Sequence, residues 1–373
     1  MSAQGKVVIK LGSSTLTDAN SRIDYGFMQD IADQIAQVKA AGWQPIIVSS
    51  GAIACGLEAL GISKRPSDLP SLQAAASVGQ NALSAAYAKA FERHGIVTSL
   101  VLLTRRDTAD RTAYLHARDT FGRLLELGVV PVVNENDTVS VEQIKFGDND
   151  TLAALVACLV GAEKVIIMSD IDGLYDANPK TNPEAKLLHR VERIDQAVMG
   201  AAGDSASAVG TGGMITKIKA ARVLMAAGSS LVVCDGHAPH IIEQVCAGEE
   251  VGTLFTNDRK PHEITPRKLW IALGDSAKGA IVVDEGAKNA LEHKGSSLLS
   301  VGICAVEGVF DADDIVDVKD ASGYLFARGR VSASNDEISL ALGRTREQLA
   351  SNRLLATLAD KPIIHRDELI IFE

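Results

Sequence analysis

Val7-Val-Ile-Lys-Leu-Gly-Ser-Ser14 joins a short apolar run to a turn of small residues. The apolar part lacks polar/apolar alternation, which predicts a strand buried on both faces of a parallel sheet. Comparable runs recur at 46–48, 129–133, 165–167 and 231–233. Helical patterns lie between such runs, for example at 27–41 and 213–227, and each ends near a glycine. This alternation predicts an α/β domain over residues 1–257, with an open, mostly parallel sheet and helices on both faces.

The pattern changes after residue 257. Residues 258–274 begin with a polar stretch that contains two prolines, and we expect a linker there. Short strands with frequent turns are predicted at 280–283, 308–310, 315–318, 324–327 and 338–340. They indicate a small β-barrel-like domain over residues 275–355, followed by a C-terminal tail at 356–373.

Composition excludes several classes of protein. Hydrophobic residues make up 46% of the chain and charged residues 23%, which is enough apolar material for a large core and excludes general disorder. The net charge of −10 divides into −6 for residues 1–257 and −4 for the rest, which argues against a nonspecific nucleic-acid binder. The longest apolar run, 152–162, is too short to cross a bilayer, and neither a signal peptide nor a CxxC pair is evident. We therefore expect a cytoplasmic protein with no membrane association.

Small and charged residues follow two of the expected strands. Lys10 comes at the end of the first, and Gly12 and Ser13 form the turn after it; Ser50 and Gly51 follow the second. Such turns can present backbone N–H groups to an anion at the carboxyl edge of a parallel sheet. Each turn taken alone is equally consistent with an ordinary strand end.

A cluster of amides and carboxylates follows the strand at 129–133. Asn134, Glu135 and Asp137 come directly after it, and residues 148–150 read Asp-Asn-Asp, with a hairpin expected between the two groups at 138–145. Asn and Asp also favour turns for purely structural reasons. At a sheet edge, however, these side chains could hold the ammonium and carboxylate groups of a small polar substrate.

A glycine-rich loop, Gly210-Thr-Gly-Gly-Met-Ile-Thr-Lys217, opens the last expected helix of the first domain. Free N–H groups and the helix dipole favour an anion there, although a flexible surface loop is the alternative. The loop matches neither the P-loop pattern nor the dinucleotide fingerprint. Ser169 and Asp170 end another expected strand. Two lysines and three possible anion sites at one sheet edge suit phosphoryl transfer, in which positioning and charge neutralisation do most of the catalysis.

The order and spacing of these motifs over residues 1–257 resemble the amino acid kinase family, in particular the branch that phosphorylates L-glutamate. Residues 275–355 resemble a PUA domain, with Asp284-Glu-Gly-Ala and Gly295-Ser-Ser-Leu-Leu as matching strings. The resemblance implies conversion of ATP and L-glutamate to ADP and L-glutamyl 5-phosphate, the first step of proline biosynthesis. It also implies feedback inhibition by proline and a homodimer or homotetramer.

The resemblance further implies a role for each motif residue. Lys10 and Lys217 would contact the transferring phosphoryl group, and Asp150 would orient both. Glutamate would bind Ser50, Gly51, Asn134, Asp137, Asp148 and Asn149. ATP would bind Lys10, Gly12, Ser13, Ser169, Asp170, Thr211, Gly212, Gly213, Met214, Ile215, Thr216 and Lys217. Mg²⁺ would be bound mainly through the ATP phosphates, without a dedicated protein site.

Two alternatives remain open. The chain could be another kinase of the same fold, acting on N-acetylglutamate, aspartate, carbamate or UMP; the 147–150 string and the appended β domain argue against this. It could instead be an RNA-binding protein with a relic kinase domain. The negative charge and few aromatic residues of the second domain argue against RNA binding, which needs phosphate neutralisation and base stacking.

Overall fold

The computed structural model describes residues 4–18, 22–104, 107, 110–139, 149–179, 181–203, 213–257, 264–273, 277–352, 355–359 and 361–372. The chain divides into two compact units, Met1–Glu263 and Ile264–Glu373. The division falls within the expected linker, and helix α12 (Pro266–Leu273) occupies much of that segment. The expected tail also contains regular structure, namely α16 (Ala356–Ala359) and β13 (Ile364–Ile371).

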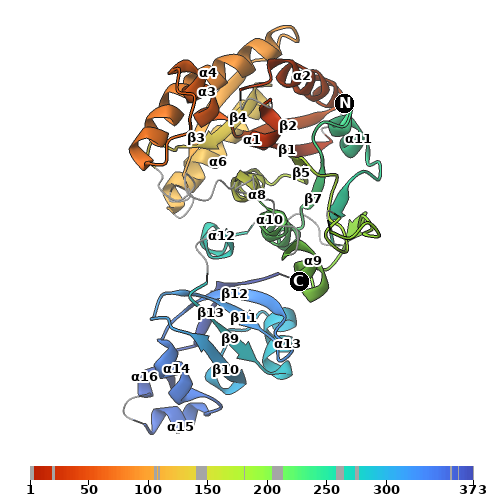
Figure 1. The fold of residues 1–373 in the computed structure, drawn as a ribbon. Coiled ribbons are helices and arrows are strands. Elements are labelled where there is room, and N and C mark those ends of the chain that lie inside the picture. The colour runs from red at the N-terminus through yellow and green to blue at the C-terminus, as the bar shows by residue number, and fades with distance from the viewer. Residues whose placement is uncertain are drawn as a thin grey trace. The chain divides into compact units, whose positions relative to one another are not determined.

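The first unit contains an eight-stranded sheet with the order β3-β4-β2-β1-β5-β7-β8-β6 (Figure 1). All neighbouring strands are parallel except β7 and β8, so the expected mostly parallel sheet is confirmed. The five runs predicted as strands lie in β1, β2, β4, β5 and β7. The strands are β1 (Gly5–Leu11), β2 (Trp43–Ser49), β3 (Thr98–Leu103), β4 (Val130–Glu135), β5 (Lys164–Ser169), β6 (Arg190–Val191), β7 (Ser230–Asp235) and β8 (Thr253–Phe255).

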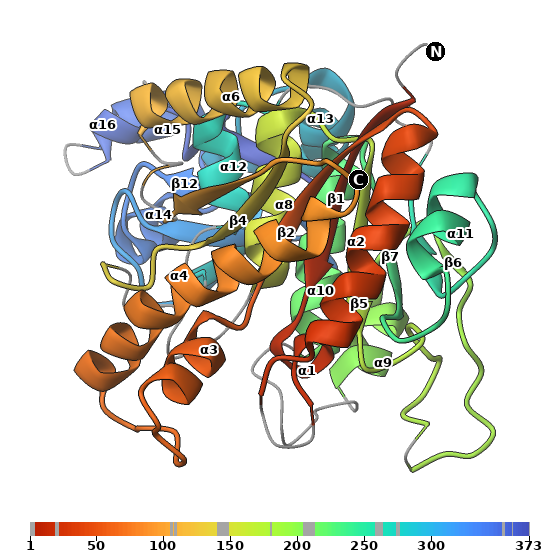
Figure 2. The ribbon, with the colours of Figure 1, turned by 90° about the horizontal axis from the view of Figure 1, so that it is seen from above.

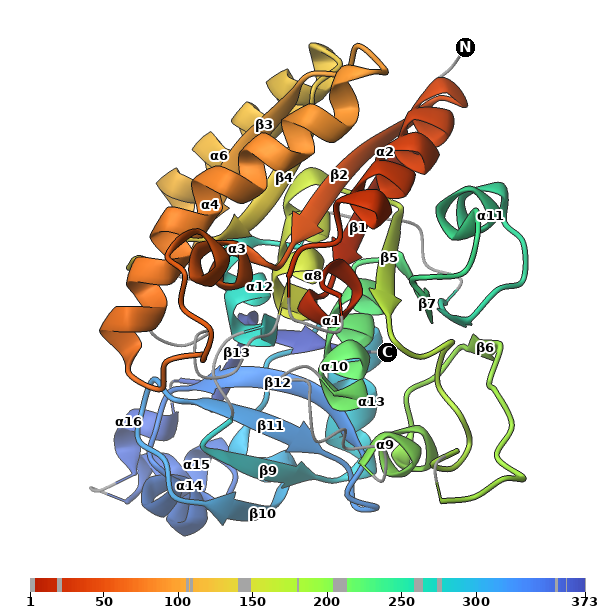
Figure 3. The ribbon, with the colours of Figure 1, turned by 45° about the horizontal axis from the view of Figure 1, so that its top comes forward.

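Helices cover both faces of this sheet. Contacts place α2, α4 and α11 in one layer and α6, α8 and α10 in the other, and Figure 3 shows α2 in front of the sheet and α8 behind it. The same two layers are visible from above in Figure 2. The helices are α1 (Ser13–Leu16), α2 (Tyr25–Ala40), α3 (Ala52–Ala59), α4 (Leu69–Glu92), α6 (Arg111–Glu126), α8 (Asn149–Val160), α9 (Gln196–Gly203), α10 (Met214–Ala226) and α11 (Ile241–Ala247).

Local sequence explains where the longer helices begin. The carboxylates of Asp24, Asp68 and Asp110 each accept a hydrogen bond from a backbone N–H three residues later, and so cap α2, α4 and α6. Such caps typically stabilise a helix by ~1 kcal/mol. Helix α8 is different, because all twelve of its residues are buried. It therefore forms an internal element rather than an amphipathic surface helix.

Two glycines allow α3 and α4 to pack with their backbones in close contact. A Cβ on Gly79 would lie 1.8 Å from the carbonyl oxygen of Ala52, and one on Gly56 would lie 1.8 Å from that of Ala75. No side chain fits at either position without separating the helices. This close packing fixes α4 relative to the turn after β2, which carries Ser50 and Gly51.

The second unit is built on a five-stranded sheet with the order β10-β9-β11-β12-β13. Its neighbouring strands are antiparallel except for β9 and β11. Its remaining elements are β9 (Gly279–Val283), α13 (Glu285–Lys294), the 3₁₀ turn η1 (Ser300–Gly302), β10 (Ile303–Gly308), β11 (Ile315–Lys319), β12 (Leu325–Val331), α14 (Asn335–Ala341) and α15 (Arg346–Ala350). A separate core of aliphatic and aromatic side chains stabilises this unit.

Two strand predictions in this unit are wrong. Residues 338–340 lie in α14, because Ser334 and Glu337 form a capping box that starts a helix there. Strand β10 ends at Gly308, whose φ of 83° turns the chain, so 309–310 are not in a strand. The hairpin expected at 138–145 lies mostly outside the described residues. Among the residues that are described, no helix combines the length and apolarity needed to cross a membrane.

Candidate active site

Lys10 comes from β1, the strand between β2 and β5 in the middle of the sheet. Its side chain is 10% exposed, and its ammonium group lies at the carboxyl edge of the sheet, 2.8 Å from Oδ1 of Asp150. Gly12 leaves room for this group, since a Cβ there would lie 3.3 Å from Lys10 Nζ. The position of Lys10 is therefore determined by the central strand and by one buried carboxylate.

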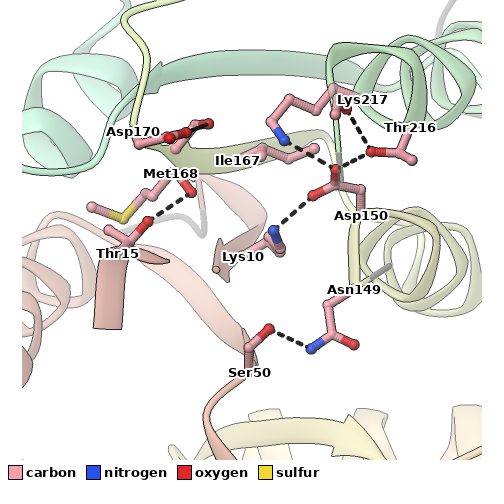
Figure 4. Close-up of polar contacts among 12 residues, drawn as sticks. Lys10, Thr15, Ser50, Asn149, Asp150, Ile167, Met168, Asp170, Thr216 and Lys217 are labelled. Carbon is pink, nitrogen blue, oxygen red and sulfur yellow. Dashed lines mark hydrogen bonds and ion pairs between the residues drawn. The ribbon is translucent and has the colours of Figure 1, made fainter. Parts of the chain in front are cut away.

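Asp150 is the second residue of α8 and is 1% exposed. Its other oxygen, Oδ2, lies 3.3 Å from Nζ of Lys217 and 2.8 Å from the hydroxyl of Thr216, both in the first turns of α10 (Figure 4). The Thr216 hydroxyl also lies 2.7 Å from the carbonyl oxygen of Gly213, which precedes the helix. One carboxylate thus brings together two ammonium groups separated by more than 200 positions in sequence.

The electrostatics of this group favour an ionised Asp150. Burial alone would raise the pKa of Asp150, but the charges of Lys10 and Lys217 and the hydrogen bonds donated by Lys10 and Thr216 outweigh it and hold the pKa at about 2. Lys10, Lys217 and Asp150, taken as a group of described residues, have a formal charge of +1. A buried group with this charge is suited to receive an anion.

Amides and hydroxyls occupy the neighbouring part of the site. Asn149, the first residue of α8, donates through Nδ2 to the Ser50 hydroxyl at 2.8 Å and to the Ser49 carbonyl oxygen at 3.0 Å. Nδ2 also lies 3.4 Å from Oδ1 of Asn134, near the end of β4. Gly51, the residue after Ser50, has a φ of 99°, a left-handed conformation that glycine adopts without strain. Asn149 therefore belongs to an amide cluster with Asn134 and Ser50. The next residue of α8, Asp150, faces the cationic group formed by Lys10 and Lys217.

Asp137 lies in the turn after β4. Burial raises the pKa of Asp137 to about 6, although the Arg65 guanidinium lowers it in part. Pairing with a cation stabilises a buried carboxylate, because the cation offsets the cost of burying the negative charge. A further cation beside Asp137 would therefore stabilise the ionised form of this carboxylate.

The residues expected to bind ATP lie mainly at strand and helix ends. Ser169 ends β5 and its hydroxyl lies 3.2 Å from Oδ1 of Asp170, which is exposed. Gly213 precedes α10, Met214 is buried in its first turn, and Ile215 is 39% exposed. Ser13 opens the short helix α1 directly after Gly12. Asp148, Thr211 and Gly212 lie outside the described residues.

Several supporting contacts carry no signal in the sequence. Gln80 of α4 accepts a hydrogen bond from Asn134 Nδ2 at 2.9 Å. The hydroxyls of Tyr87 and Ser49 are 2.8 Å apart, and both are fully buried. Thr15 donates to the Met168 carbonyl oxygen at 3.4 Å and so ties α1 to β5. A glutamine, a tyrosine and a threonine on helices have no distinguishing feature in one sequence, so these roles could not be predicted.

The described residues contain no group of three or more His, Cys, Asp or Glu side chains that could hold a metal ion. Mg²⁺ is commonly bound through one or two carboxylates together with substrate phosphates. The donor set of this site fits a metal that is bound chiefly by a nucleotide, with Asp170 as an exposed carboxylate at its edge.

Comparison with known proteins agrees with this geometry. Residues 5–235 match the model of the Amino acid kinase family, and residues 279–350 match the PUA domain. A glutamate 5-kinase from Geobacter sulfurreducens is 44% identical over 366 residues, which cover 98% of this chain and 97% of the relative. A glutamate 5-kinase from Caldanaerobacter subterraneus subsp. tengcongensis is 42% identical over 368 residues, which cover 99% and 98%.

A solved structure supports the fold alone. The carbamate kinase from Giardia lamblia bound to AMP-PNP superimposes with a TM-score of 0.51 at 16% identity, over 69% of this chain and all of that chain. Both the α/β class expected from the sequence and the PUA assignment of the second domain are confirmed. The chain belongs to the amino acid kinase family, within its glutamate 5-kinases, and carries a C-terminal PUA domain.

Proposed function

We propose that the protein transfers the γ-phosphoryl group of ATP to the γ-carboxylate of L-glutamate, forming L-glutamyl 5-phosphate as the first step of proline biosynthesis. The observation that carries the proposal is the convergence of Lys10 and Lys217 on one buried carboxylate. The relatives named glutamate 5-kinase, which align over nearly the whole chain, support the choice of substrate.

The reaction needs no general base. The γ-carboxylate has a reference pKa of ~4.3 and is already ionised at neutral pH. One of its oxygens attacks the γ-phosphorus, and the bond from that phosphorus to the bridging oxygen breaks, so that ADP leaves with the electron pair. Both reactants are anions, and the main task of the site is to cancel their repulsion. Lys10 and Lys217 supply that charge, and Asp150 holds the two ammonium groups in place.

The two substrates would occupy different parts of the site. Phosphates would lie against Lys10, Lys217 and the N-terminal turns of α1 and α10, with Mg²⁺ on the phosphates supplying further charge neutralisation. ATP would contact Gly12, Ser13, Ser169, Asp170 and residues 211–217. Glutamate would lie against Ser50, Gly51, Asn134, Asp137, Asp148 and Asn149, with its ammonium group near Asp137. These assignments follow from the family resemblance, and the hydrogen-bond pattern around Asp150 and Asn149 supports them.

Proline is the expected inhibitor. It carries the ammonium and carboxylate groups of an amino acid but lacks a γ-carboxylate to be phosphorylated, so it would compete with glutamate without reacting. We further expect a cytoplasmic homodimer or homotetramer. For the inhibitor, a loss of activity with proline that glutamate relieves would support the expected inhibition, and indifference to proline would contradict it.

Hydroxylamine trapping tests the proposal directly. The purified protein is incubated with ATP, Mg²⁺ and L-glutamate, and acyl phosphate is measured as the hydroxamate. Aspartate, N-acetylglutamate, carbamate and UMP serve as competing substrates in parallel ADP-release assays. The expected result is hydroxamate formation that requires both ATP and glutamate. Turnover of another substrate in preference to glutamate would refute the proposal.

A further inference from the structure

Gln80 is a buried glutamine of α4 that contacts the amide cluster without belonging to any motif. The residue is 8% exposed, and its Oε1 accepts from Nδ2 of Asn134 at 2.9 Å. Asn134 is 3% exposed, and its own oxygen lies 3.4 Å from Nδ2 of Asn149. A chain of carboxamides thus leads from α4 through β4 to α8.

A backbone N–H group, which can only donate, determines which way the Asn134 amide is oriented. The backbone N–H of Glu135 donates to Oδ1 of Asn134 at 2.9 Å. Turning the Asn134 amide around would bring its NH₂ group against two donors, this N–H and Asn149 Nδ2. Asn134 must therefore direct its NH₂ group toward α4, where it needs an acceptor. Oε1 of Gln80 is that acceptor.

The second half of the Gln80 amide has no comparable role. Its Nε2 is buried and finds no hydrogen-bond partner among the residues that the structure describes. A buried donor without a partner is normally unfavourable, so its presence needs an explanation. The explanation here is that the oxygen of Gln80 is needed as the acceptor for Asn134, and an amide oxygen is always joined to an NH₂ group.

The orientation of Asn134 affects the ligand site through its contact with Asn149. Nδ2 of Asn149 lies within hydrogen-bond distance of three acceptors, namely the Ser50 hydroxyl, the Ser49 carbonyl oxygen and Oδ1 of Asn134. These acceptors together determine which side of the amide carries its NH₂ group, and the Asn149 oxygen is then the group that is available to a ligand. On the proposed function, that oxygen and the Asp137 carboxylate would both serve as acceptors for the substrate. Acceptors of this kind recognise a ligand ammonium group.

We propose that Gln80 is a positioning residue, which acts through Asn134 to hold the amide cluster in the orientation that recognises the substrate ammonium group. This inference rests on the proposed function, because it takes the ligand of the cluster to be an amino acid. It assigns the role to one atom of Gln80, the acceptor Oε1.

Two substitutions separate this role from a general effect on folding. Gln80→Met keeps the approximate volume and removes the acceptor. Gln80→Glu keeps an acceptor oxygen whether the buried carboxyl group is ionised or neutral. The readouts are the KM for glutamate, the KM for ATP, kcat, and the inhibition constant of glutarate, which has both carboxylates of glutamate but no ammonium group.

We expect Gln80→Met to raise the KM for glutamate about tenfold, equivalent to ~1.4 kcal/mol, while the KM for ATP and the glutarate constant change less than threefold. Gln80→Glu should restore the glutamate KM to within threefold of the wild type. The inference is wrong if Gln80→Met leaves the glutamate KM unchanged, if it weakens glutarate equally, or if Gln80→Glu is as impaired as Gln80→Met. Should Gln80→Met not fold, Gln80→Ala carries the same expectations.

Gln34 of α2 provides a matched control. It is also a buried helical glutamine, 2% exposed, but its amide bonds the backbone N–H of Ile242 and the Asp30 carboxylate. Gln34→Met should lower the melting temperature and leave the glutamate and glutarate constants unchanged. The wild-type assay separates failure of the proposed function from failure of the role given to Gln80. If it forms no hydroxamate from glutamate, the proposed function fails; if it does and the variants behave otherwise than expected, only the role of Gln80 fails.

Discussion

Replacing Asp150 with asparagine removes a negative charge that contacts two buried ammonium groups. The substitution keeps the size and shape of the side chain, so the loss is electrostatic. Lys10 Nζ lies 2.8 Å from one carboxylate oxygen and Lys217 Nζ lies 3.3 Å from the other. All three side chains are at most 10% exposed, and solvent therefore screens them little.

These distances set the magnitude of the effect. With an effective dielectric constant of ~20, each ammonium group attracts the carboxylate by ~5–6 kcal/mol before the cost of burial is counted. Removing one partner of a buried ion pair typically destabilises a protein by ~3–5 kcal/mol, because it leaves an uncompensated charge. Asp150→Asn removes the carboxylate that both Lys10 and Lys217 contact. We therefore expect the free energy of unfolding at pH 7 to fall by at least ~3 kcal/mol.

Urea denaturation followed by circular dichroism measures this change. Glu92→Gln, which removes an exposed ion pair with Lys89 on α4, is the control and should have no measurable effect. Because the pKa of Asp150 is held at about 2, below the ordinary value of 3.8, its stabilisation is complete above pH 3.8 and is lost as the pH falls from 3.8 to 2. ATP should stabilise the variant at least as much as the wild type, since phosphate oxygens can replace the lost anion. A loss of stability below ~1 kcal/mol would refute the charge-balance reasoning.

Four further outcomes test other parts of the structure. Lys217→Ala should lower kcat ~10²–10³-fold in the hydroxamate assay, since it removes one preorganised donor to the transition state; turnover within threefold of the wild type would exclude that role. The KM for glutamate should rise as the pH falls below about 6, because Asp137 becomes protonated there and loses its attraction for the ammonium group; Asp137→Asn should raise this KM at pH 7 and abolish its pH dependence. Gly79→Ala should greatly reduce stability in thermal melts, because the added Cβ would lie 1.8 Å from a carbonyl oxygen of α3, whereas Gly122→Ala, where the Cβ meets no atom within 4 Å, should be tolerated. EDTA should abolish turnover without lowering the melting temperature of the nucleotide-free protein, and a large drop in melting temperature would indicate a structural metal instead.

The predicted fold of the first unit rested on runs that are buried on both faces. Runs such as 165–167 and 231–233 have no polar positions, which fits strands in a sheet that is covered on both sides. The second unit was predicted less well, because its elements are short and half-exposed. The 338–340 run suited a strand by residue type, but the capping box at Ser334 and Glu337 determines a helix. A local signal of this kind outweighs the preference of three residues.

For the candidate site, the sequence indicates which residues end strands and begin helices, but it does not indicate which of them meet. The common carboxyl edge of parallel strands places Lys10, Asn134 and Ser169 in one region. The contact of Asp150 with Lys217 depends on how α8 packs against α10, which is a tertiary property. The support by Gln80 depends on the close approach of α3 and α4 through Gly79, and no strand-end pattern reveals it.

The start of α8 links the two parts of the site. Asn149 belongs to the amide cluster and Asp150 to the cationic group, and consecutive side chains of a helix point ~100° apart. The separation between the proposed amino-acid and phosphoryl subsites therefore depends on helix geometry rather than on a loop. Because every residue of α8 is buried, a shift of the helix would disturb the whole core of the first unit. Phosphoryl transfer between two anions depends on the relative position of the two reactants. A buried helix such as α8 holds Asn149 and Asp150 more rigidly than surface loops could.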